Sequence, residues 1–275
     1  MRLIVYADRS VLEVDGKKVE FTEGPQSQET KGRLAKIKAA LDSGFLEDLI
    51  REQRATPLSH DKLDDDALEF TAELVDSVTS EVGRAMVVLT ILQASVKCIE
   101  PEQSVRLHKG GSSPRDFSWT GGISMRTLDK GYITPILRKE GLLSLNADGT
   151  MMTRTLAENY PYSLLYKAHL RGAKRAWLQI VEGLEAGEFE AKNVVRRVVS
   201  LLINRSNSFD ATAAEIVQTA SGITHKYQAQ EISRIILQFV QKEEYSARLF
   251  EVMLHSLFQV LQEDGDLDGY LKPLS

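Results

Sequence analysis

Cysteine is nearly absent from this chain: Cys98 is the only one among 275 residues. A single thiol excludes an intrachain disulfide and a zinc site built from cysteines. The same lack fits a protein of the reducing cytoplasm. Histidine is also sparse, and the five residues are too dispersed to form a short-range pair of metal ligands: His60, His108, His169, His225 and His255. We therefore expect no metal and no cofactor.

Long apolar runs are missing as well. The longest begins at Ala85 and has about half the length needed to cross a bilayer. The first residues contain no extended apolar region followed by a small-residue cleavage site, so we expect no signal peptide and no membrane partner. The chain also lacks a Walker loop, a dinucleotide-binding fingerprint and a nucleophile elbow, and so has no recognisable catalytic motif.

Positive charge is outnumbered overall, with 34 Lys and Arg against 39 Asp and Glu, but it is concentrated in one segment. Residues Val105 to Arg175 hold 12 Lys and Arg against 5 Asp and Glu, whereas the rest of the chain holds 22 against 34. An acidic protein with one basic segment is expected to present that segment to an anionic partner. Duplex DNA is the first candidate.

Alternating apolar residues predict strands within residues 2–22, with a tight hairpin at Asp15-Gly16 because both residues tolerate positive φ. The pattern then becomes helical. One long helix is expected from Asp64 to about Cys98, bent at Gly83 and ended by Pro101. The other helices are expected at 30–42, 45–54, 160–186, 189–204, 211–221, 225–242 and 245–263.

The predicted fold is mainly α, with a small N-terminal β-hairpin or meander, a helix-turn-helix-like segment with a β wing, and a C-terminal helical bundle. We divide the chain into residues 1–102, 103–163 and 164–275, of which the last two also fit one continuous domain. The helix at 245–263 is apolar nearly all round. It is therefore expected either at the centre of the C-terminal bundle or against a second copy of the chain.

Local signals in the basic segment predict the helix-turn-helix. Thr134-Pro135 favours a helix start and Gly141 a helix end, so a short helix is expected from Pro135 to Glu140. A helical turn at 124–129 precedes it, and we expect Lys130-Gly131 to separate the two. A hairpin at Asn146–Gly149 would then form the wing.

Basic and aromatic side chains of this segment are the predicted DNA contacts, because Lys and Arg hold phosphates and reach base edges. A second basic group is expected on one side of the 160–186 helix, opposite a core side that includes Trp177. The full set of predicted contacts is Lys109, Arg115, Arg126, Lys130, Tyr132, Arg138, Lys139, Arg154, Lys167, Arg171, Lys174 and Arg175.

The run from Ser124 to Ser163 also carries a resemblance. It contains Arg126-Thr127-Leu128-Asp129, then Thr134-Pro135, Thr153-Arg154-Thr155-Leu156 and Pro161-Tyr162. This order resembles a segment of bacterial restriction-modification proteins of the type II restriction endonuclease kind. The resemblance implies site-specific DNA recognition in a restriction or antiphage system, with a nuclease or another defence subunit as partner. It supplies no catalytic centre.

Two alternatives stay open. Glu190-Ala191-Lys192 has the Glu-x-Lys spacing of many Mg²⁺-dependent nucleases, which would make the chain a restriction endonuclease with a divergent metal site. Such sites also need an Asp on a preceding strand, and no Asp lies between Asp148 and Asp210. The other alternative is a helical interaction protein whose basic segment docks an acidic protein.

Overall fold

A computed structural model describes residues 1–56, 64–107, 118–143, 160–167, 169–221 and 246–263, together with Arg234 and Leu237. The chain divides into two compact units, Met1–Asn207 and Ser208–Ser275. The segment boundaries predicted at residues 102 and 163 both fall inside the first unit. The prediction of a mainly helical fold with a small N-terminal β element is confirmed.

The N-terminal β element is a three-stranded antiparallel meander of β1 (Arg2–Val5), β2 (Arg9–Val14) and β3 (Lys17–Thr22) in that order. The strands β2 and β3 pair from Val14 opposite Lys17 to Arg9 opposite Thr22. Asp15 and Gly16 join them with φ angles of 48° and 78°. Two consecutive positive φ values fit the twist of the flanking strands, and this confirms the predicted hairpin.

A small core fastens the sheet to the helical part of the first unit. Leu12 and Phe21 from the sheet are buried with Leu107 and Trp119, and the Phe21 and Trp119 rings meet edge to face with centroids 6.3 Å apart. The backbone N–H of Thr120 donates to the Thr22 carbonyl at 3.0 Å, which continues the pairing beyond β3.

Two helices follow the sheet as predicted. α1 (Gln28–Asp42) begins at Ser27, whose hydroxyl oxygen accepts a hydrogen bond from the Thr30 N–H. α2 (Phe45–Ala55) follows after Gly44, which has a φ of 94° and lets the chain turn sharply between the two helices.

The single long helix predicted from Asp64 to Cys98 is wrong. The chain forms α3 (Asp65–Asp76), a 3₁₀ turn η2 (Ser77–Thr79) and α4 (Glu81–Ile99). Ser80 starts α4, because its hydroxyl oxygen accepts from the Gly83 N–H at 2.9 Å. The local Ser and Thr residues therefore form a new N-cap where the pattern predicted only a bend.

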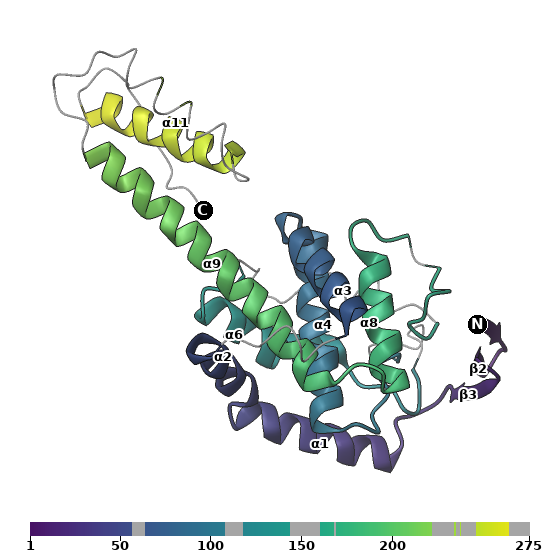
Figure 1. The fold of residues 1–275 in the computed structure, drawn as a ribbon. Coiled ribbons are helices and arrows are strands. Elements are labelled where there is room, and N and C mark those ends of the chain that lie inside the picture. Colours follow the sequence, from purple (N-terminus) through teal and green to yellow (C-terminus); the bar gives the residue numbers. More distant parts are fainter. Residues whose placement is uncertain are drawn as a thin grey trace. The chain divides into compact units, whose positions relative to one another are not determined.

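α4 is the central helix of the first unit. Its residues from Ala85 to Val96 are buried on every side, and α1, α3 and α8 (Lys174–Ala186) pack around it (Figure 1). By length and composition alone α4 could cross a membrane, but most of it lies inside the protein. Burial among other helices accounts for the same apolar composition.

The helix predicted at 160–186 begins fourteen residues later than expected, at Lys174. The described residues before it are not helical. The Tyr162 N–H donates to the Arg106 carbonyl at 2.8 Å, and Gly172 takes a φ of 81°, which a helix does not allow. The predicted core side is confirmed within α8, where Trp177 is fully buried.

One continuous helix, α9 (Ala191–Ser221), replaces the two predicted at 189–204 and 211–221. The polar run between them contains neither Pro nor Gly, so nothing stops the helix there. In the second unit α11 (Ser246–Glu263) confirms the last predicted helix. Apart from Arg234 and Leu237, the helix predicted at 225–242 lies outside the described residues.

A substitution at Gly83 would test how closely η2 packs on α4. A Cβ at Gly83 would lie 1.8 Å from the Ser77 carbonyl oxygen, whereas a Cβ at Gly32 in α1 meets nothing within 4 Å. We expect Gly83→Ala to lower the free energy of unfolding by about 1–3 kcal/mol or more. The control Gly32→Ala should raise it by about 1 kcal/mol. Urea unfolding checks both, and equal effects at the two positions would contradict the close contact.

Candidate nucleic-acid interface

The middle of the basic segment forms one run of helical turns. α5 (Met125–Leu128), a π-helical turn η3 (Asp129–Ile133) and α6 (Thr134–Lys139) follow each other without an intervening loop. The two predicted helical pieces are present, but the predicted separation at Lys130-Gly131 is wrong, because both residues lie inside the π turn. We call the whole run from Met125 to Lys139 the recognition segment.

Pro135 explains the wide turn. Proline has no N–H to donate, and its ring would clash with the carbonyl four residues earlier in a regular α-helix. In the π turn the Thr134 N–H bonds instead to the Asp129 carbonyl, five residues back. Turns of this kind open the helix locally and often occur at functional sites.

The Thr134 side chain does not cap a helix, contrary to the prediction. Thr134 itself is helical, and its hydroxyl donates to the Asp129 carboxylate at 2.6 Å. Both side chains are buried, with exposures of 1% and 2%. The only acidic residue of the recognition segment is therefore held inside the protein, bonded across the π turn.

The far end of the recognition segment closes as the sequence predicted. Gly141 has a φ of 68°, its N–H donates to the Arg138 carbonyl, and the Leu142 N–H donates to the Leu137 carbonyl. This is the Schellman arrangement, which satisfies the last carbonyls of a helix. The adjacent Glu140 forms a 2.7 Å ion pair with Arg54 of α2, so its charge is already compensated.

The outward side of the recognition segment carries only positive charge. Arg126, Lys130, Arg138 and Lys139 are exposed, while the aliphatic side chains between them are buried, namely Leu128, Ile133, Ile136 and Leu137. Among the described residues, Arg126, Arg138 and Lys139 form no ion pair with a carboxylate. We call these four side chains the cationic face.

Tyr132 belongs more to the fold than to this face. It packs against the main core, and its hydroxyl donates to the Asp42 carboxylate at the end of α1, 3.4 Å away. Desolvation, followed by the nearby Asp42 charge, raises the pKa of Tyr132. The tyrosine thus connects the π turn to α1.

The second basic group does not form the predicted stripe on one helix. Lys167 and Arg171 lie in the non-helical stretch before α8, and only Lys174 and Arg175 lie in the helix. Two of the four already have partners within the protein. The Lys167 ammonium lies 5.8 Å from the centroid of the Tyr160 ring, and the Lys174 ammonium donates to the Tyr166 carbonyl.

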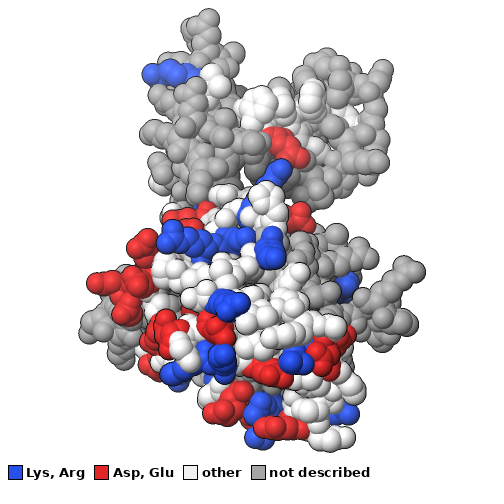
Figure 2. Space-filling view, turned by 90° about the vertical axis from the view of Figure 1, so that its right-hand side faces the viewer, with Lys and Arg blue, Asp and Glu red and all other residues white. Residues whose placement is uncertain are grey.

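The helices α6 and α8, which carry part of each basic group, lie on different sides of α4. Figure 1 shows α6 on the side of α4 where α2 lies, and α8 on the other side. Figure 2 shows the side that carries the sheet and α8, where Lys and Arg are interspersed with Asp and Glu. The other predicted contacts, Lys109, Arg115 and Arg154, lie outside the described residues, as does the hairpin expected at Asn146–Gly149.

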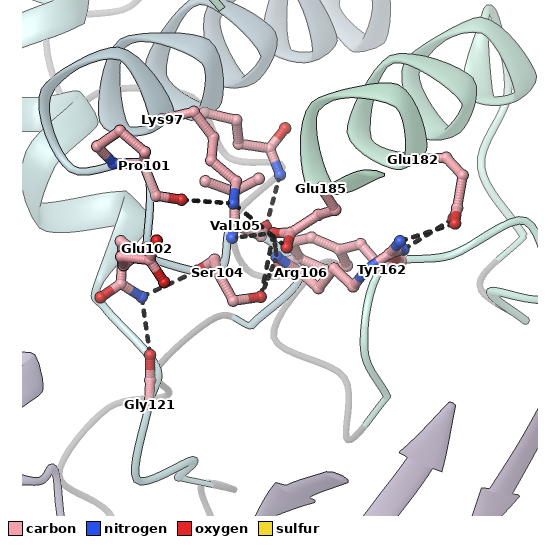
Figure 3. A network of polar contacts seen from close by, with 12 residues as sticks. Lys97, Pro101, Glu102, Ser104, Val105, Arg106, Gly121, Tyr162, Glu182 and Glu185 are labelled. Atoms are coloured by element: carbon pink, nitrogen blue, oxygen red, sulfur yellow. Dashed lines mark hydrogen bonds and ion pairs between the residues drawn. The ribbon is translucent and has the colours of Figure 1, made fainter. Parts of the chain in front are cut away.

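A buried polar network contains Arg106, one of the twelve Lys and Arg residues between Val105 and Arg175 (Figure 3). The Arg106 guanidinium forms two hydrogen bonds with the Glu182 carboxylate, at 2.8 and 2.9 Å, and a third with the Tyr162 carbonyl. Glu185 accepts from the Val105 and Arg106 N–H groups. No local sequence pattern predicts this network, because its partners are more than fifty residues apart in the chain.

Glu190 and Lys192 lie at the start of a helix, whereas the Glu-x-Lys pair of Mg²⁺-dependent nucleases lies on a strand. Glu190 comes directly before α9, where its carbonyl accepts from the Val194 N–H and its carboxylate accepts from the Asn193 amide at 2.7 Å. These contacts satisfy the start of a helix, and neither Glu190 nor Lys192 lies on a strand. Within the described ranges, no group of three or more His, Cys, Asp and Glu side chains is placed to hold a metal ion.

No protein-family model, curated protein or solved structure matches this chain. The resemblance of Ser124–Ser163 to a segment of restriction-modification proteins therefore stays a prediction from those forty residues. Function has to be inferred from the chemistry of the chain itself.

The Asp129–Thr134 bond gives a direct test of the π turn. Thr134→Val keeps the shape of the side chain but leaves a buried carboxylate without its hydroxyl donor, so we expect a loss of about 1–3 kcal/mol in the free energy of unfolding. Thr134→Ser keeps the hydroxyl and should retain most of that stability. Thermal and urea unfolding of the two variants checks this, and a Thr134→Val variant as stable as Thr134→Ser would contradict the role of the bond.

Proposed function

We propose that this chain binds duplex DNA through the cationic face, as a DNA-recognition subunit or module. The observation that carries the proposal is the exposed side of the recognition segment, with four cations and no carboxylate, in a protein whose formal net charge is −5. The resemblance of Ser124–Ser163 supports a place in a restriction or antiphage system, where another subunit would supply cleavage.

The stability of α6 accounts for only two of the four cations of the cationic face. Arg138 and Lys139 lie in the last turn of α6, where cations interact favourably with the negative end of the helix dipole. Arg126 and Lys130 lie in the first half of the run and gain nothing from that end. Arg126 is exposed and forms no ion pair with any described residue, which favours a partner outside the chain.

The length of the cationic face suits a duplex. At about 1.5 Å per residue, the thirteen steps from Arg126 to Lys139 cover roughly 20 Å. The major groove of B-DNA is about 12 Å wide, so such a segment is long enough to contact the phosphates on both sides of it. Arg126 and Arg138 can also hold a phosphate or a guanine with two parallel hydrogen bonds.

The contacts proposed here are mainly with phosphates. A recognition helix inserted into the groove was predicted from a two-helix outline that the π turn replaces. Phosphate contacts need only correctly spaced cations on a rigid element, and the buried side of the recognition segment supplies that rigidity. Lys167, Arg171, Lys174 and Arg175 have a secondary place in the proposal, since two of them already have partners within the protein.

Neutralising the cationic face tests the proposal. We expect Arg126→Gln/Arg138→Gln/Lys139→Gln to weaken duplex binding at least about tenfold at low salt, because three phosphate contacts disappear. The slope of log affinity against log salt concentration should also become shallower by about 2–3. Fluorescence anisotropy with a labelled duplex at several salt concentrations measures both.

A matched control is available in the sheet and near the start of α1. Arg2→Gln/Lys17→Gln/Lys31→Gln removes the same charge from β1, β3 and α1, at positions that lie on the other side of the first unit from α6 (Figure 1). We expect this variant to keep the wild-type salt slope. Equal losses in the two triple variants would mean that net charge, and not the cationic face, governs binding.

The same titration separates the alternatives. Competition by poly-glutamate as strong as competition by duplex DNA would favour the acidic-protein partner. Mg²⁺-dependent cleavage by the purified chain, abolished by Glu190→Ala or Lys192→Ala, would favour the endonuclease.

A further inference from the structure

A groove separates the inner face of the sheet from the end of α8. It has a volume of about 810 Å³, which lies within the usual range of binding pockets. Its sheet wall is apolar and consists of Leu12, Val14, Val19 and Phe21. Val19 is 49% exposed, although it lies on the same sheet face as the buried Leu12 and Phe21. The sheet therefore presents apolar surface that the described part of the chain does not fully cover.

The opposite wall of the groove is acidic. It carries Glu102, Glu182, Glu185 and Glu188, with Lys97 and Arg106 between them. Figure 3 shows that the two cations are already used: Arg106 bonds to Glu182, and Lys97 lies 3.4 Å from Glu185. Asp15 and Lys17 also line the groove, and their opposite charges sum to zero.

Two carboxylates of this wall have no described partner. Glu102 and Glu188 are exposed, and neither forms an ion pair within the part of the chain that the structure describes. Glu188 also follows Gly187, the C-cap of α8, at the end of the helix where the dipole is negative and an anion is unfavourable. Helix stability therefore gives no reason for an acid there, whereas a bound cation would find both charges favourable.

We propose that this groove docks an extended, cationic segment of a partner protein, in which apolar residues alternate with Lys or Arg. Side chains of an extended segment point alternately to opposite sides. The apolar ones would lie on the sheet wall, and the cationic ones would face Glu102 and Glu188. A cationic partner complements the acidic wall of the groove, whereas DNA would be repelled by it. This proposal therefore does not depend on DNA binding by the cationic face.

The test uses the full chain and two labelled model peptides, Val-Lys-Val-Lys-Val and Val-Glu-Val-Glu-Val. We expect the lysine peptide to bind and the glutamate peptide not to bind, as read by fluorescence anisotropy. Glu102→Lys/Glu188→Lys should weaken binding of the lysine peptide at least about tenfold, since two attractive charges become repulsive.

The matched control is Glu69→Lys/Glu73→Lys, which makes the same charge change at two exposed positions of α3 outside the groove. Its affinity for the lysine peptide should stay within about twofold of wild type, because distant surface charges are largely screened. Unfolding temperatures of both variants establish that they are folded. The proposal is overturned if the lysine peptide does not bind, if the glutamate peptide binds equally well, or if both double variants lose affinity equally.

Discussion

Burial of α4 on every side is the constraint on which the first unit depends. Residues Ala85 to Val96 have no polar side to leave in water, so other elements have to cover the helix all round. α1, α3 and α8 pack on it, and the π turn of the recognition segment packs on it as well. Because one side of the recognition segment is committed to this core, its other side is fixed in orientation toward solvent.

Charge is sorted by the same packing. The Asp129 carboxylate turns inward and bonds to Thr134, while Arg126, Arg138 and Lys139 stay outside. Near the end of α8 the sorting is reversed: Lys97 and Arg106 are bound to Glu185 and Glu182 within the network. Two further carboxylates, those of Glu102 and Glu188, are left at the surface. One acidic chain thus presents a cationic helical side and a separate acidic groove, and for these two surfaces we propose a polyanion and a cationic partner.

Local signals predicted the parts of the fold that local chemistry decides. The Asp15-Gly16 hairpin and the Gly141 helix end both follow from residues that tolerate positive φ, and both are confirmed. The start of α8 was placed wrongly, because the backbone bond from Tyr162 to Arg106 joins residues far apart in the sequence. The cationic side chains themselves were identified from composition. Their common exposure could not be, since it depends on which side of the recognition segment the core covers.

Lysine footprinting locates the interface most directly. Acetylation of the free protein and of its complex with duplex DNA would be compared by mass spectrometry at each lysine. We expect DNA to protect Lys130 and Lys139, while Lys17 of β3 and Lys31 of α1 stay reactive. Unchanged acetylation of Lys130 and Lys139 in a saturated complex would contradict it.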